Sequence, residues 1–318
     1  MTAAHTLAAP TLASGAKAQP FEGVLAPVVT PFRADLSPDT ERYVAHCRWL
    51  LSQKCDGLAV FGTNSEANSL SLAERNELLD RLIEAGIPGA RLMPGTGACA
   101  LPDAVAATKH AVTRGCGGVL MLPPFYYKGV SDDGLYAFFS EVVQRVGSRA
   151  LKLYLYHIPP VAQVSIPLKL IERLIKAYPD TVVGIKDSSG DWNNTKSVLD
   201  AFPGFGTFAG SEAALLATLR GGGVGCITAT GNINPAGIRR VFETWRTAEA
   251  DGIQEKVTAF RNTMQSFPMI PALKAVVGHF RKDENWRRVR PPLVGLADDV
   301  RTRLVGAIGT HGFTMPGL

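Results

Sequence analysis

Several residues that can carry out carbonyl chemistry follow short apolar runs, and Lys186 is the most informative of them. It closes the run Val-Val-Gly-Ile at 182–185. A lysine in a desolvated site has a lowered pKa, and its neutral amine attacks a ketone or aldehyde to form a Schiff base. Alternatively, Lys186 is a structural residue, either paired with Asp187 or with its side chain reaching solvent from the end of the run. On composition alone we favour a structural role.

A second candidate is the stretch Gly62-Thr63-Asn64-Ser65-Glu66. Glycine lets the backbone approach a ligand closely, and successive backbone N–H groups can bind a carboxylate. The hydroxyl of Thr63 can also relay a proton. An ordinary turn between a strand and a helix explains the same stretch equally well, so both interpretations stay open.

Tyrosines supply the third candidate group. Tyr156 ends one apolar run, and Tyr126 lies just beyond another. A phenol beside an imine can donate and accept a proton. Lys152, Tyr154 and Tyr156 would point to the same face of a strand, since side chains alternate along it. Only its position at the end of the run distinguishes Tyr156 from a packing residue.

Metal and nucleotide sites are not indicated. The six histidines are scattered, only His157 ends an apolar run, and no His-Glu-x-x-His motif occurs. The glycine-rich stretch 221–225 precedes an apolar run instead of following one, unlike a dinucleotide fingerprint. The loops that hold Glu212 and residues 232–234 lack lysine and arginine, which argues against a phosphorylated substrate. We therefore expect no metal and no cofactor.

These residues must be positioned by a repeating set of elements. Eight short apolar runs begin at Gly23, Gly57, Arg91, Gly117, Leu151, Val182, Gly206 and Gly225. Runs that are apolar on both faces are typical of parallel strands covered by helices. Between them, helical spacing marks residues 37–55, 71–85, 102–114, 132–146, 167–178, 193–202 and 211–220, and Ser71 with Glu74 forms a capping-box pattern. Eight such units predict an α/β fold, a (β/α)₈ TIM barrel.

The chain divides into three expected parts. Residues 1–20, rich in Ala, Thr and Pro, are expected to form a flexible N-terminal arm. Residues 21–234 are expected to form the catalytic barrel. Helical patterns at 235–250, 252–265 and 271–280 predict that residues 235–318 form a C-terminal helical appendage packed on the barrel.

Composition narrows the class of protein. The chain has 318 residues, 46% of them hydrophobic and 19% charged, as in a globular protein with a large core. The net charge of +5 comes from interleaved signs, so we expect no nucleic-acid partner. No long apolar run suggests a membrane span, and no secretory signal is recognised. Five cysteines without a Cys-x-x-Cys pair fit reduced thiols and a cytoplasmic location.

Taken together, the ends of the apolar runs resemble the dihydrodipicolinate synthase / N-acetylneuraminate lyase family of class I pyruvate aldolases. The resemblance extends from about residue 21 to residue 296. Its motifs occur in the family's order, at 62–66, 124–127, 156–159, 184–187, 210–212 and 225–228. The combination is specific, although each motif alone is not.

The resemblance implies roles for the candidates. Lys186 would form the Schiff base with pyruvate or another 2-oxo acid, and Tyr156 would hydrogen-bond the imine and shuttle a proton. Thr63 would lie in a proton relay that Tyr126 completes, typically across a tight dimer interface. No cofactor is implied, and the family's usual dimer of dimers makes a homotetramer the expected assembly.

Substrate binding follows from the same resemblance. The backbone N–H groups of Thr63 and Asn64, beside Gly62, would hold the carboxylate of the 2-oxo acid. Ile227 would contact the acid through its backbone. Ser188 and Glu212 loosely match the positions with which sialic acid lyases select a long polyhydroxylated substrate.

Departures from the family leave the second substrate open. Asn64 and Ser65 stand where the family usually has Thr or Ser and then Gly. Val161 stands where dihydrodipicolinate synthases have the arginine that binds aspartate semialdehyde. We therefore expect a lyase that makes or breaks a C–C bond between pyruvate and an aldehyde. The alternatives are 4-hydroxy-tetrahydrodipicolinate synthase, a 2-keto-3-deoxy sugar acid dehydratase or aldolase, sialic acid lyase, or a catalytically idle barrel with a regulatory role.

Overall fold

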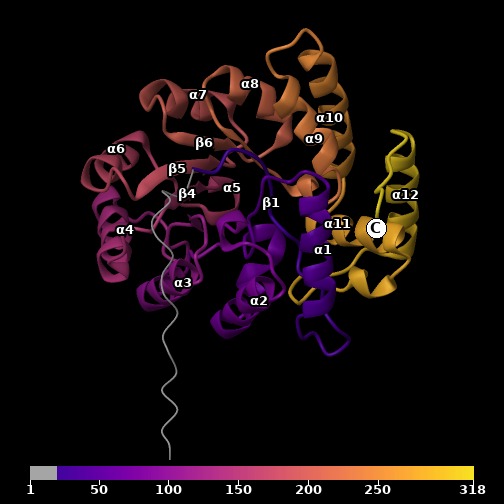
Figure 1. The fold of residues 1–318 in the computed structure, drawn as a ribbon, viewed down its shortest axis with the longest axis horizontal. Coiled ribbons are helices and arrows are strands. Elements are labelled where there is room, and N and C mark those ends of the chain that lie inside the picture. The colour runs from indigo at the N-terminus through magenta and orange to yellow at the C-terminus, as the bar shows by residue number, and fades with distance from the viewer. Residues whose placement is uncertain (1–19) are drawn as a thin grey trace, which may run out of the picture.

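A curled sheet of parallel strands forms the centre of the molecule (Figure 1). The computed structural model describes residues 20–318, so residues 1–19 of the expected N-terminal arm lie outside the described residues. Seven strands pair in the order β2-β1-β7-β6-β5-β4-β3. They are β1 (Gly23–Ala26), β2 (Gly57–Leu58), β3 (Val119–Met121), β4 (Leu153–His157), β5 (Val182–Asp187), β6 (Gly206–Ala209) and β7 (Gly225–Ile227).

The remaining expected strand, which begins at Arg91, closes the sheet without forming a regular strand. Leu92 bridges Leu58 of β2, and Gly95 bridges Leu120 of β3, both in parallel. Pro94 lacks an N–H group and so interrupts the ladder of hydrogen bonds at this point. All eight apolar runs thus contribute to one closed ring, as a barrel requires.

Helices cover the outer face of this sheet (Figure 1). The capping box predicted at Ser71 is confirmed, since Ser71 Oγ accepts the Glu74 N–H at 3.1 Å and the Glu74 carboxylate accepts the Ser71 N–H at 2.8 Å. The helix expected at 211–220 begins instead with a 3₁₀ turn, Glu212–Ala214. The helices are α1 (Thr40–Ser52), α2 (Leu72–Glu84), α3 (Leu101–Thr113), α4 (Asp132–Val146), α5 (Pro159–Ala162), α6 (Leu168–Ala177), α7 (Trp192–Ala201) and α8 (Leu215–Arg220).

Side chains fill the inside of the barrel near the N-terminal ends of the strands. Tyr154 points inward from β4, and its phenol oxygen accepts the backbone N–H of Phe21 at 3.0 Å. Gly184 on the neighbouring strand leaves room for this ring, because a Cβ at 184 would overlap it. Strand alternation then brings Tyr156 and Lys186 inward one layer higher, toward the C-terminal ends of the strands.

The chain after β7 is helical, as expected from residue 235 onward. It forms α9 (Pro235–Thr244), α10 (Ala250–Gln265), α11 (Met269–Arg281) and α12 (Asp298–Gly309). Residues 271–278 of α11 are all buried, and this helix contacts the turn after β2. α12 had no predicted counterpart in the sequence.

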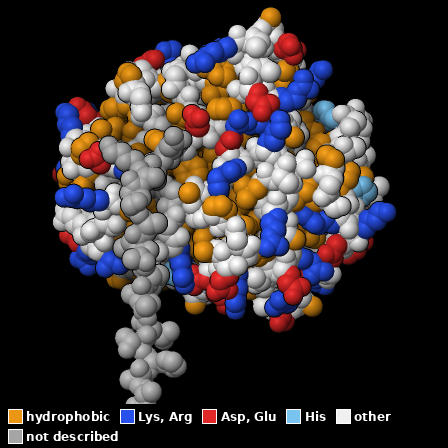
Figure 2. Space-filling model, viewed as in Figure 1, with side chains coloured by type: hydrophobic (Ala, Val, Ile, Leu, Met, Phe, Trp, Pro, Cys, Tyr) orange, Lys and Arg blue, Asp and Glu red, His pale blue; other side chains and the backbone are white. Residues whose placement is uncertain are grey.

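The surface shown in Figure 2 intersperses acidic and basic side chains and has no broad basic area. This distribution agrees with the interleaved charges of the sequence. Within residues 20–318, no helix combines the length and apolar character needed to cross a membrane.

Candidate active site

Lys186 lies near the end of β5 and is 3% exposed. Its neighbour Asp187 faces the other way, toward α7, and its carboxylate accepts hydrogen bonds from Asn194 (3.0 Å) and Thr195 (2.6 Å). Among the described residues, Lys186 forms no salt bridge with any carboxylate. The alternative of a Lys186–Asp187 ion pair is therefore wrong.

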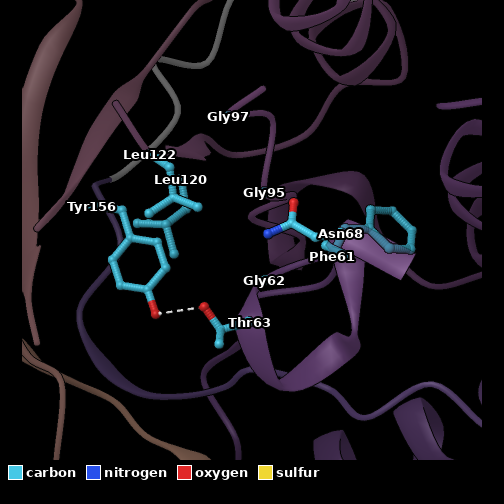
Figure 3. Close-up of a pocket in the computed structure, with 10 residues that line it drawn as sticks. Phe61, Gly62, Thr63, Asn68, Gly95, Gly97, Leu120, Leu122 and Tyr156 are labelled. Carbon is cyan, nitrogen blue, oxygen red and sulfur yellow. Dashed lines mark hydrogen bonds between the residues drawn. The ribbon is translucent and has the colours of Figure 1, made fainter. Parts of the chain in front are cut away.

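The amine of Lys186 belongs to a short chain of polar groups. Lys186 Nζ donates to Tyr156 Oη at 3.3 Å and lies 4.3 Å from the centre of the Tyr156 ring. Tyr156 stands beside Lys186 in the β4–β5 register. On its other side, Tyr156 Oη lies 3.2 Å from Thr63 Oγ1 (Figure 3). The phenol thus connects the amine to a hydroxyl that lies beyond the end of a different strand, β2.

Thr63 opens a 3₁₀ turn, Thr63–Ser65, that follows β2. Ser65, where the resemblance leads us to expect glycine, uses its hydroxyl to accept the Gly62 N–H at 3.2 Å. Within the part of the chain that the structure describes, the N–H groups of Thr63 and Asn64 have no hydrogen-bond acceptor. This is usual for the first residues of a helical turn, and it makes both groups free to bind an anion.

A small cavity of about 20 Å³ adjoins Thr63 and Tyr156, and such a volume accommodates about one water molecule. Asn68 and Leu120 line it on other sides (Figure 3). Gly95 lines it as well, and a Cβ there would collide with the Phe61 backbone just before the turn. Nothing in the sequence singles out Asn68, because its place beside Thr63 depends on how the chain turns after residue 66.

Two more candidates lie near the same end of the strands. Ile227 is fully buried on β7 and packs in the same interior cluster as Tyr156. Ser188 directly follows β5, is half-buried, and donates its N–H to the His157 carbonyl at 2.7 Å. Their roles in binding the substrate stay predictions.

Glu212 occupies a different environment from the one expected of a substrate ligand. Its carboxylate is buried and accepts hydrogen bonds from the hydroxyls of Thr228 and Thr230. Arg261 of α10 lies 3.4 Å away on the same carboxylate. Because these groups already satisfy the acid, contact with a substrate would require one of them to move, and the predicted role of Glu212 is untested.

Tyr126 lies apart from the series of polar groups Lys186, Tyr156 and Thr63 in this single protomer. It is 74% exposed, and its ring packs edge-to-face on the 71% exposed Tyr127. No hydrogen bond joins Tyr126 to Thr63. Its predicted role in the relay stays a prediction, because the resemblance places that contact across a subunit interface.

His157 ends β4, and one of its ring nitrogens is used by the backbone. Its Nδ1 accepts the Ile166 N–H at 3.0 Å, and burial lowers the pKa of His157. No group of three or more His, Cys, Asp or Glu side chains with metal-binding geometry occurs in residues 20–318.

Comparison with known proteins decides the family. The sequence profile of the Dihydrodipicolinate synthetase family matches residues 20–310. The chain belongs to this family. Its motifs, read above as a resemblance, therefore come from common descent over nearly the whole chain.

Two relatives within the dihydrodipicolinate synthetase family carry different names. An uncharacterized DapA-like lyase of Chloroflexus aurantiacus is 32% identical, with 87% of this chain and 92% of the relative aligned. A 4-hydroxy-tetrahydrodipicolinate synthase of Rhizobium meliloti is 27% identical, with 93% of this chain and 99% of the relative aligned.

Solved structures agree with the family. Dihydrodipicolinate synthase from Agrobacterium tumefaciens superposes with a TM-score of 0.84 at 32% identity, over 91% of this chain and 99% of that one. YagE, a prophage protein of the same family from E. coli K12 in complex with pyruvate, gives a TM-score of 0.85 at 25% identity, over 92% of this chain and 99% of that one.

Proposed function

We propose that this protein is a class I lyase that makes or breaks a C–C bond between pyruvate and an aldehyde through an imine on Lys186. The observation that carries the proposal is the chain from Lys186 Nζ through Tyr156 Oη (3.3 Å) to Thr63 Oγ1 (3.2 Å). A buried amine, a phenol that is both donor and acceptor, and a second hydroxyl are the parts that imine chemistry needs. Membership of the family and a pyruvate complex of a relative support the same reading.

The chemistry follows from these groups. The neutral amine of Lys186 attacks C2 of pyruvate, and loss of water leaves a protonated imine. The imine draws electrons from C3, so that transfer of a C3 proton to the phenolate that Tyr156 has become gives an enamine. The enamine carbon then attacks the aldehyde carbon, and the new alkoxide takes up a proton. Water finally hydrolyses the product imine and frees the amine of Lys186. In the cleavage direction the same steps run backwards.

Tyr156 and Thr63 handle the protons in this scheme. Tyr156 gives a proton to the departing hydroxyl during imine formation and to the alkoxide after the C–C bond forms. Thr63 Oγ1, at 3.2 Å from the phenol, resupplies it. The unpartnered N–H groups of Thr63 and Asn64 bind the pyruvate carboxylate close to this chain.

The second substrate is a neutral aldehyde in this proposal. Val161, on α5, presents a 62% exposed apolar side chain at the position where dihydrodipicolinate synthases have an acid-binding arginine. Lys128 approaches the same helix, but it donates to the carbonyls of Ala162 (2.8 Å) and Phe125. An aldehyde with a carboxylate tail, such as aspartate semialdehyde, would therefore lack a free cation on this side.

A homotetramer built as a dimer of dimers completes the proposal. The exposed pair Tyr126 and Tyr127 gives the apolar surface through which a second subunit would join the relay to Thr63. Sedimentation or light scattering tests this assembly, and a monomer at assay concentration would contradict it.

Reductive trapping tests the proposed chemistry. The protein is incubated with pyruvate and borohydride, and the modified residue is located by mass spectrometry. A stable adduct on Lys186 that Lys186→Ala abolishes is the expected result. Absence of an adduct with pyruvate and with other 2-oxo acids would show that the proposal is wrong. A panel of neutral and acidic aldehydes, offered with pyruvate, then defines the second substrate.

A further inference from the structure

A fully buried charge pair lies directly behind the proposed active-site turn. Lys274 Nζ of α11 contacts Glu66 Oε1 at 2.7 Å, and both side chains are 0% exposed. Glu66 is the residue that ends the turn Thr63–Ser65. The pair thus joins the C-terminal helices to the backbone that follows β2, across 208 residues of sequence.

The pair fixes the backbone of the turn and not only its side chains. Glu66 has a left-handed backbone conformation (φ 56°), which is uncommon for a residue other than glycine. Its other carboxylate oxygen accepts the Arg290 N–H at 2.8 Å, and its own N–H donates to the Thr63 carbonyl at 3.1 Å. Both oxygens of the acid are therefore partnered, and this holds Glu66 in a conformation that it would otherwise rarely adopt.

Further contacts support the turn from the same side. Thr30 Oγ1 donates to the Ser65 carbonyl at 2.8 Å, and Ser65 Oγ accepts the Gly62 N–H. The backbone is thus held from behind at residues 62, 65 and 66. What remains unpartnered in the described structure is the front of the turn, the N–H groups of Thr63 and Asn64.

A buried ion pair is a poor source of stability, because desolvation of two charges offsets most of their attraction. Its more general use is to specify one geometry among several. Here the geometry in question is the direction of two N–H groups and of Thr63 Oγ1, which lies 3.2 Å from Tyr156.

We propose that Glu66 and Lys274 are positioning residues that aim the Thr63–Ser65 turn at the carboxylate of the bound 2-oxo acid. The inference rests on the proposed function. It makes α11, which is outside the ring of strands, part of what determines affinity for the acid group. Lys274 itself does not form the imine, because its ammonium is enclosed and paired with Glu66.

Two ketones separate this role from a general loss of structure. Pyruvate uses the turn through its carboxylate, whereas acetone forms the same imine on Lys186 but has no carboxylate. The doubly substituted protein Glu66→Gln/Lys274→Met removes both charges at nearly constant volume. We measure, for each ketone, the concentration that gives half-maximal trapping by cyanoborohydride.

The expected result is a selective loss. The double variant should need about 10- to 100-fold more pyruvate than the unmodified protein, because a misplacement of binding groups by about 1 Å has effects of this size. Its half-maximal acetone concentration should change less than about threefold. The matched control is Asp283→Asn, which removes the Arg42–Asp283 ion pair (2.6 Å) just after the end of α11 and involves no residue of the turn. In this control, the half-maximal trapping concentrations of pyruvate and of acetone should both stay unchanged.

The other outcomes contradict either the positioning role alone or the proposed function as well. An adduct in the unmodified protein together with an unchanged pyruvate requirement in the folded double variant would overturn the positioning role alone. An equal loss for pyruvate and acetone would also overturn it. No adduct in the unmodified protein would overturn the proposed function and this inference with it. Should the double variant fail to fold, Glu66→Asp keeps both charges, shortens the acid by one methylene, and is judged by the same comparison.

Discussion

Two lysines are buried within residues 20–318, and their surroundings differ in the group that each amine contacts. Lys186, 3% exposed, and Lys274, 0% exposed, each lie against an aromatic ring, with Nζ 4.3 Å from the centre of Tyr156 and 4.5 Å from that of Phe32. Lys274 Nζ contacts a carboxylate at 2.7 Å, whereas Lys186 Nζ contacts a phenol at 3.3 Å. The partner, and not the degree of burial, distinguishes the two sites.

This difference explains why only one of them suits chemistry. Burial lowers the pKa of Lys274 to about 8, although the Glu66 carboxylate opposes that shift. A carboxylate holds the ammonium proton and accepts its hydrogen bond, so the amine has no free pair of electrons to offer a ketone. An uncharged phenol holds the proton of an ammonium group less strongly than a carboxylate does, and it can accept a hydrogen bond from the amine while it donates its own proton to a reacting oxygen.

The largest expected effect comes from Lys186→Ala. Turnover and the pyruvate adduct should both fall below detection, because no other accessible amine in the site forms the imine. The free energy of unfolding should fall little or rise, since the substitution removes a buried amine that has no carboxylate partner. Mass spectrometry after trapping and urea unfolding measure the two quantities, and an adduct that persists would contradict the assignment.

Lys274→Ala should show the opposite pattern. It leaves the Glu66 charge buried without its partner, which we expect to lower the free energy of unfolding by about 3–5 kcal/mol. The double variant Glu66→Gln/Lys274→Met should recover most of this loss in urea unfolding. A single variant that costs less than about 1 kcal/mol would mean that the pair does not behave as a buried pair.

Tyr156→Phe removes the phenol hydroxyl that Lys186 contacts, and so tests the partner that distinguishes Lys186 from Lys274. Turnover should fall by about a hundredfold or more, because general acid–base groups contribute about 10²- to 10⁴-fold, while trapping on Lys186 falls less. Tyr154→Phe is the matched control, since Tyr154 faces the same interior two residues earlier and bonds only the Phe21 N–H. An unchanged turnover in Tyr156→Phe would show that Tyr156 only packs in the interior and transfers no proton.

The smallest expected effect concerns a neutral buried group on α1, His46. It packs on the rings of Trp49 (5.7 Å) and Trp286 (5.1 Å), and burial, with a contribution from Arg281, lowers the pKa of His46 to about 3. Between pH 6.5 and about 3 the unfolded chain therefore binds more protons at this residue, so stability falls as the pH falls through this window.

From pH 7 to pH 5, His46 should account for a loss of about 2 kcal/mol in the free energy of unfolding. His46→Leu should remove that part of the pH dependence in urea unfolding, whereas His311→Gln, at an exposed histidine, should leave it in place. Equal pH dependence in the unmodified protein and in His46→Leu would show that His46 is not held neutral by burial.

Much of the fold followed from local pattern. The eight apolar runs all lie in the ring of strands, and helix α4 has the bounds predicted from its spacing, 132–146. Two features depended on interruptions that periodicity does not describe. Pro94 turns an expected strand into isolated bridges, and the prolines at 159 and 160 start the short helix α5.

The candidate site was predictable as a set of residue types but not as a set of contacts. Lys186, Tyr156 and Thr63 were singled out because each follows the end of an apolar run. Glu212 was singled out in the same way, yet its carboxylate is bonded by Thr228 and Thr230. Strand-end position alone does not distinguish a group that faces a ligand from one that faces a neighbouring loop.

By itself, the sequence determined the alternation of elements and the order in which reactive residues appear, because hydrophobic periodicity and strand ends are local properties of a chain. Only the tertiary structure decided which buried lysine is paired. Glu66 and Lys274 are 208 positions apart, and their contact exists because α11 packs behind the turn that follows β2. The reactivity of a buried amine depends on the groups within about 4 Å of it, and folding brings those groups from distant parts of the chain.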